Sequence, residues 1–188
     1  MTAGVAIVWS SAAFLAVFLA WFAWSFNRLV RDRNLVTEGW SGIDVQLKRR
    51  HDLVPSLVET VRGYAEFEKG LLEDVTRLRA GASGREATRE LRNDENALTD
   101  RLRTLFAVAE AYPDLKANRS FLTLQQQLTE IEDALQYARR YYNGTVRNFN
   151  IRVESFPSNL VARLFGFSQA EFFEIQTATE RQTPSVDV

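Results

Sequence analysis

The strongest constraint in this sequence is an uncharged segment at its N-terminus. Residues 2–27 contain no Asp, Glu, Lys, Arg or His, although the rest of the chain is rich in charge. A transmembrane helix needs about 20 consecutive apolar residues, so the segment is long enough for one crossing. Buried helices of soluble proteins rarely run this far without a charge. We therefore expect a membrane anchor over residues 1–27.

The two ends of this segment predict its orientation. Tryptophan rings favour the level of the lipid headgroups, and basic residues favour the cytoplasmic side. The predicted anchor residues are Trp9, Trp21, Trp24, Arg28, Arg31 and Arg33. Because all three arginines follow the span and no basic residue precedes it, residues 28 onward are expected in the cytoplasm. A cleaved signal peptide needs a basic start and a small-residue cleavage site, and the segment has neither.

Composition excludes several kinds of chemistry. The chain has no cysteine and a single histidine, His51, which rules out disulfides, thiolate nucleophiles and a His-rich metal site within one chain. Its 23 basic and 24 acidic residues give a net charge of −1, so no general attraction to nucleic acid is expected. We expect a non-enzymatic protein without metal or cofactor.

Apolar residues after the anchor follow the heptad spacing of packed helices. The first series is Val36, Trp40, Ile43, Leu47, Val54, Leu57, Val61, Tyr64, Leu71, Val75 and Leu78. It predicts a long first helix with Arg50 and Glu68 in the two gaps. Pro55 removes the hydrogen bond to the carbonyl of His51, so a kink of more than about 20° or a short break is expected there. Gly63 and Gly70 predict the close approach of another backbone.

Two more helices complete the predicted domain. Residues 80–84 are small and predict a turn, after which Leu91, Leu98, Leu102, Leu105, Ala109 and Tyr112 form a second seam with Glu95 in its gap. Asn118 is the expected N-cap of a third helix with the seam Phe121, Leu124, Leu128, Ile131, Leu135, Ala138, Tyr142, Val146, Phe149 and Val153.

Short turns between long helices predict antiparallel packing. The expected fold is all-α. An N-terminal transmembrane helix is followed by an up-down bundle over residues 28–173, with three long helices, the first kinked at Pro55, and a short C-terminal helix. Residues 155–158 end the third helix, and residues 174–188 are expected to be a disordered tail.

Some positions are candidates for interaction or helix register: Trp40, Ile43, Leu47, Arg50, Glu68, Phe156, Phe165 and Phe167. The charged gap residues have two open interpretations, because their side chains either reach water or form an Arg–Glu pair with another helix or subunit. The apolar cluster from Phe156 to Phe173 either caps the bundle or docks on lipid or a partner. Glu130, Glu132 and Asp133 are interpreted as an exposed acidic face.

Five ordered blocks of the sequence resemble the LemA family. They are residues 34–36, 40–61, 112–118, 141–150 and 155–160, which read NLV, WSGIDVQLKRRHDLVPSLVETV, YPDLKAN, YYNGTVRNFN and SFPSNL. Ser56 departs from the asparagine usual in the family, and residues 81–96 match weakly. The resemblance implies a bacterial membrane protein with an N-terminal anchor, a helical bundle and no established catalytic activity. Genes of the family often lie near those of envelope proteins such as membrane metalloproteases, and a related protein serves magnetosome membrane organisation.

Two functions fit these features. The favoured one is a scaffold in the bacterial inner membrane that binds lipid, forms homo-oligomers or recruits envelope proteins. The first predicted helix carries an apolar stripe that contains Val36, Trp40 and Ile43. Two helices packed together cannot cover so wide an apolar surface, and the stripe therefore predicts contact with another copy of the chain. The alternative is a phosphorelay module using His51, since residues 51–57 are similar to the phosphoacceptor box of sensor histidine kinases. The proline is one position too early for that box, and the default interpretation is a solvated or capping histidine.

The topology can be tested with cysteines introduced into the cysteine-free chain. With the basic flank in the cytoplasm, a membrane-impermeant thiol reagent should label Thr2→Cys and not Ser185→Cys in intact cells. Labelling after lysis controls for reactivity at both positions. Labelling of Ser185→Cys alone in intact cells would reverse the predicted orientation.

Overall fold

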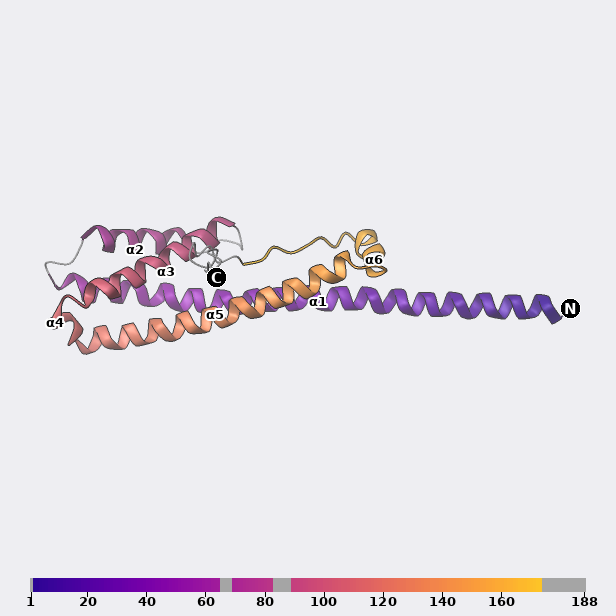
Figure 1. The fold of residues 1–188 in the computed structure, drawn as a ribbon, viewed down its shortest axis with the longest axis horizontal. Helices are drawn as coiled ribbons and strands as arrows, with labels where there is room; N and C mark the ends of the chain where they lie inside the picture. Colours follow the sequence, from indigo (N-terminus) through magenta and orange to yellow (C-terminus); the bar gives the residue numbers. More distant parts are fainter. Residues whose placement is uncertain (1, 65–68, 83–88, 174–188) are drawn as a thin grey trace, which may run out of the picture. The chain divides into compact units, whose positions relative to one another are not determined.

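The computed structural model describes residues 2–64, 69–82 and 89–173, and within these ranges all regular secondary structure is α-helical. The helices are α1 (Thr2–Arg62), α2 (Lys69–Ala82), α3 (Arg89–Ala109), α4 (Pro113–Lys116), α5 (Arg119–Glu154) and α6 (Ser158–Leu164) (Figure 1). The all-helical prediction is confirmed. In the described part, α1 is the one helix that is long and apolar enough to cross a membrane, by length and composition. The predicted disordered tail lies outside the described residues.

The described chain divides into two compact units. The first comprises residues 2–41 and 140–172, and the second comprises residues 42–139 and 173. Both α1 and α5 contribute to each unit, so the two long helices link them through the backbone.

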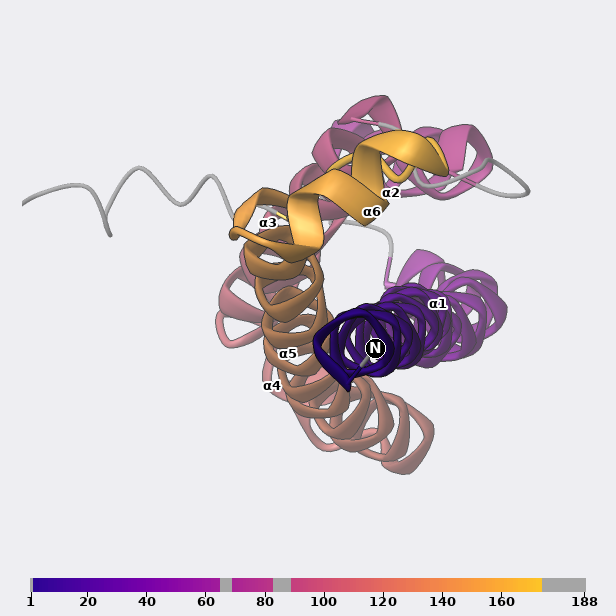
Figure 2. The same cartoon turned by 90° about the vertical axis from the view of Figure 1, so that its right-hand side faces the viewer.

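In the first unit, the beginning of α1 is bare and its continuation is packed. Side chains from Val8 to Leu19 are exposed on all faces, and no other element runs beside them in Figure 1. Farther along α1, Leu29 is fully buried with Phe149 of α5 and Val161 of α6. Figure 2 shows α6 lying across the C-terminal end of α5. The apolar segment that follows α5 therefore folds back onto α1 and α5 within the first unit.

The helices α1 and α5 approach closely at a glycine of the first unit. A Cβ atom added to Gly39 would lie only 3.2 Å from the backbone Cα of Tyr142. The neighbouring Trp40 places its ring edge-on to that of Tyr142, with 5.7 Å between the centroids. Gly39 is thus the position where the absence of a side chain permits backbone contact. The predicted approach at Gly63 and Gly70 is wrong, because an added Cβ would meet only the carbonyl of Thr60 at Gly63 and nothing at Gly70.

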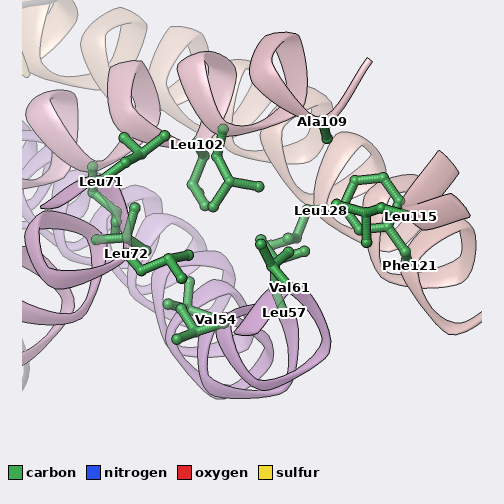
Figure 3. Close-up of a cluster of buried hydrophobic side chains, with 14 residues drawn as sticks. Val54, Leu57, Val61, Leu71, Leu72, Leu102, Ala109, Leu115, Phe121 and Leu128 are labelled. Carbon is green, nitrogen blue, oxygen red and sulfur yellow. The ribbon is translucent and has the colours of Figure 1, made fainter. Parts of the chain in front are cut away.

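The second unit is built around one apolar core (Figure 3). Its buried members come from five helices: Val54, Leu57, Val58 and Val61 of α1; Leu71, Leu72 and Val75 of α2; Leu98, Leu102, Leu105 and Ala109 of α3; Leu115 of α4; Phe121 and Leu128 of α5. Most of these residues belong to the predicted seams, so heptad spacing identified the core. Asn118 caps α5 as predicted, because its Oδ1 accepts hydrogen bonds from the backbone N–H groups of Ser120 and Phe121 at 2.8 and 3.2 Å.

The predicted first helix is wrong in one respect: it is two helices. Helix α1 ends at Arg62, directly before Gly63, and α2 begins at Lys69. The turn predicted at residues 80–84 begins too early, because α2 continues to Ala82, and residues 83 and 84 lie outside the described part. Between α5 and α6, the predicted end of the third helix at residues 155–158 is confirmed.

Helix α1 continues through Pro55, so the break considered from the sequence is absent. Proline cannot donate to the carbonyl four residues earlier, which belongs to His51. Arg79 of α2 replaces the missing donor, because its Nε donates to that carbonyl at 3.1 Å. The packing of α2 thereby satisfies the backbone group that Pro55 frees. The bend angle stays a prediction.

Candidate functional site

A cluster of buried charges lies within the second unit, at the contact of α1, α3 and α5. Its centre is Arg50, which is fully buried on α1. One terminal nitrogen, Nη2, forms an ion pair with Glu95 of α3, and the other, Nη1, forms one with Glu132 of α5. Nη1 also donates to the hydroxyl of Thr99 at 2.7 Å. One guanidinium group therefore joins three helices that are far apart in the sequence.

Glu95 is the second fully buried member of the cluster. His51 Nε2 lies 2.8 Å from Glu95 Oε1, while Arg50 pairs with Oε2, so both carboxylate oxygens have a nitrogen neighbour. Burial alone would raise the pKa of Glu95, but the hydrogen bond from His51 and the charge of Arg50 outweigh it and hold the pKa below its usual value of 4.5. Glu95 is therefore ionised at neutral pH although it is buried.

Arg139 of α5 adds a second buried guanidinium group, only 2% exposed. Its Cζ lies 4.6 Å from the centroid of the Phe173 ring, a cation–π arrangement. Burial, followed by the nearby charge of Arg50, lowers the pKa of Arg139 to about 10, against the opposing effect of Glu132 and Glu95. Its Nε and Nη2 atoms have no hydrogen-bond partner within the described part of the chain.

The buried charges of the cluster compensate one another. Two arginines and two glutamates balance in charge, and the central pair is closed to water. Such buried pairs add little net stability compared with apolar packing, but they penalise arrangements that leave a charge unpaired. Among the described residues no group of three His, Cys, Asp or Glu side chains is placed to hold a metal ion.

Comparison with known proteins places this architecture in a family. The family model described as LemA family matches residues 39–188, about four fifths of the chain. The chain belongs to the LemA family. The resemblance found in the sequence is thus confirmed, and the matched region includes every residue of the charged cluster.

Three relatives illustrate the similarity. Protein LemA of Metamycoplasma hominis is 28% identical over 165 residues, which cover 86% of this chain and 73% of that protein. Magnetosome protein MamQ 2 of Paramagnetospirillum magneticum is 23% identical over 190 residues, with 87% and 70% covered. Magnetosome protein MamQ of Magnetospirillum gryphiswaldense is 21% identical over 164 residues, with 73% and 60% covered.

The structure decides between the interpretations of the charged gap residues in this LemA-family chain. Arg50 and Glu95 form an Arg–Glu pair between helices and do not reach water. The solvated histidine was wrong, because His51 is only 7% exposed. The interpretation of Glu132 as part of an exposed face was also wrong, since it pairs with Arg50, although Glu130 and Asp133 are exposed. Glu68 lies outside the described residues.

Sequence reasoning missed Thr99, Glu132 and Arg139. A second series of residues on α5 has the same alternating spacing of four and three as the apolar seam. It runs through Leu128, Glu132, Leu135, Arg139 and Tyr142. A straight helix has 3.6 residues per turn, so its buried face includes positions of both registers. Charged residues next to seam positions, such as Glu132 and Arg139, were therefore the signal in the sequence for further buried charges.

The remaining predicted site residues lie in different surroundings. Trp9, Trp24 and Arg31 are exposed, Trp21 and Arg28 are half-buried, and Arg33 lies over the ring of Phe167, with 5.2 Å between its Cζ and the centroid. Ile43 and Leu47 are buried, Trp40 and Phe167 are half-buried, and Phe156 and Phe165 are exposed. Arg33 and Phe167 are thus brought together, while the roles of these residues stay predictions.

The charged cluster can be tested through Glu95→Gln. The substitution leaves Arg50 buried beside a neutral amide, so the free energy of unfolding should fall by about 3–5 kcal/mol, the range for a broken buried pair. The exposed Glu130→Gln should change it by less than about 0.5 kcal/mol. Denaturant unfolding of the detergent-solubilised protein measures both values.

A double variant and a pH series supply the controls. Adding Arg50→Met to Glu95→Gln should cost less than the sum of the single losses, since each single change already breaks the Arg50–Glu95 pair. Because the pKa of Glu95 is lowered on folding, its stabilising contribution is complete above pH 4.5 and is lost as the pH falls through the lower folded value. Additive losses, or a stability difference independent of acidification, would contradict a coupled buried pair.

Proposed function

We propose that this LemA-family protein is a non-enzymatic scaffold anchored in the bacterial inner membrane. Residues 1–27 form the single-pass anchor, the N-terminus faces outward, and the helical domain lies at the cytoplasmic face. The observation that carries the proposal is the buried cluster centred on Arg50. Its charged side chains form ion pairs that join α1, α3 and α5. Because Arg50 and Glu95 are fully buried in these pairs, a substrate has no access to them.

The proposed scaffold is an antiparallel up-down bundle carried by α1, with a bend at Pro55. The paired packing of α2 with α3 and the common apolar core of the second unit support this arrangement. Two of the relatives described above are named as magnetosome proteins, and a structural task within a cellular assembly fits those names better than a reaction does.

We further propose that the scaffold self-associates. The stripe first considered for this contact is a poor choice, because Ile43 is buried and Val36 and Trp40 are half-buried within the chain itself. A better surface lies on α5, where Tyr137 and Tyr141 are 69% and 46% exposed and stand one turn apart. Tyrosine is enriched at the energetic centres of protein interfaces, and a membrane anchor concentrates subunits in two dimensions.

Mass measurement in mild detergent tests self-association. The wild type should exceed the mass of one chain, and the pair Tyr137→Ser and Tyr141→Ser should shift the population toward one chain. Leu122→Ser, at an apolar position of the same helix that is 45% exposed, is the control and should leave the mass unchanged. A wild type that is strictly monomeric would remove self-association. Crosslinking in intact membranes with mass spectrometry would then test recruitment of other proteins.

The phosphorelay alternative is tested directly. His51 is buried and its Nε2 faces the carboxylate of Glu95, so a phosphodonor has poor access to it. Incubation with a small phosphodonor should therefore yield no acid-labile phosphate, and the wild type should match His51→Ala. Label on the wild type that is absent from His51→Ala would replace the scaffold with the phosphorelay function.

A further inference from the structure

The short helix α6 presents its apolar side chains in an unusual direction. Val161 and Ala162 are buried against the first unit, as expected for one face of an amphipathic helix. The opposite face is apolar too, because Leu160 and Leu164 are 56% and 69% exposed and lie one turn apart. Phe156, four residues before Leu160, is 79% exposed. We call these three exposed apolar side chains the α6 patch.

Phe165, the residue directly after α6 and next to Leu164 of the α6 patch, adjoins the end of the apolar segment of α1. The ring of Phe165 lies 4.6 Å from that of Phe26 and 5.9 Å from that of Phe22, measured between centroids. Both α1 residues belong to the last two turns of the proposed anchor. The apolar surface of α1 therefore continues onto α6.

Basic side chains surround the same level of the first unit. Arg28 and Arg31 follow the apolar segment on α1, and Arg33 lies over Phe167, which follows α6. Arg163 is exposed on α6 between Leu160 and Leu164. An apolar surface bordered by arginines matches the boundary between acyl chains and anionic headgroups.

We propose that the α6 patch inserts into the boundary of the membrane that α1 crosses, and that lipid is its occupant. The proposal rests on the proposed anchor, since α1 must bring the patch to the bilayer. Lipid is favoured over a protein because the patch is continuous with a helix surface already exposed to lipid. The contact gives the first unit a second attachment beside α1 and thereby restricts its rotation about the anchor.

Single-cysteine variants of the full chain test the insertion. Leu160→Cys and Leu164→Cys, labelled with an environment-sensitive fluorophore, are reconstituted into vesicles of phosphatidylcholine and phosphatidylglycerol. Leu15→Cys reports the anchor, and Leu122→Cys, which is similarly exposed but belongs to the second unit, is the matched control. Each label is exposed in turn to a lipid-borne nitroxide and to aqueous iodide.

The labels on α6 should show blue-shifted emission and nitroxide quenching several-fold stronger than at position 122. Quenching at position 15 without quenching at 160 and 164 would overturn the α6 proposal while leaving the anchor intact. Absence of quenching at position 15 would remove the anchor itself. Protection of 160 and 164 from iodide without lipid quenching would mean that protein covers the patch, which also overturns the proposal.

A second variant guards against distortion by the label. Leu160→Asn and Leu164→Asn together remove apolar surface from exposed positions, so circular dichroism should stay unchanged. A label at Phe156→Cys should then lose its nitroxide quenching and become accessible to iodide. An unchanged label in this folded variant would show that the patch does not hold the segment in lipid.

Discussion

The second unit depends on one requirement, that the buried positive charge of Arg50 be paired. Its side chain is fully buried, and an uncompensated charge in that position would cost several kcal/mol of folding free energy. Glu95 and Glu132 supply the compensation from two other helices. Apolar seams tolerate sliding by a turn because leucine replaces leucine, but this pairing does not. The pairing is therefore expected to favour the alignment of α1, α3 and α5 in which these three side chains meet.

The same principle explains how α1 tolerates Pro55. A proline within a helix leaves the carbonyl four residues earlier without its donor, and here Arg79 of α2 supplies one. That carbonyl belongs to His51, whose side chain contacts Glu95 in the charged cluster. The backbone of α1 and the side chains of the cluster are thus satisfied by neighbouring helices at adjacent points. The position of α2 is tied to that of α3 through these contacts as well as through the apolar core.

Heptad spacing predicted the helices and most of the core, because burial of one apolar stripe follows directly from helix geometry. It placed Leu98, Leu105 and Leu128 correctly, and it put Arg50 and Glu95 in gaps of the seams, which left open whether their side chains reach water. It could not pair them, since contact between residues distant in sequence depends on how whole helices align. It also extended the first helix past Gly63, because an apolar period continues across a break that only backbone conformation reveals.

The two units differ in how their apolar side chains are covered. In the second unit, the apolar core and the central charges of the cluster are covered by other helices of the chain. In the first unit, the beginning of α1 and the outer face of α6 remain apolar and uncovered. Water is a poor solvent for both surfaces, and lipid is the medium proposed above for each. The first unit thus differs from the second in exposing apolar surface on α1 and α6, whereas the second unit encloses an apolar core and a buried ion pair.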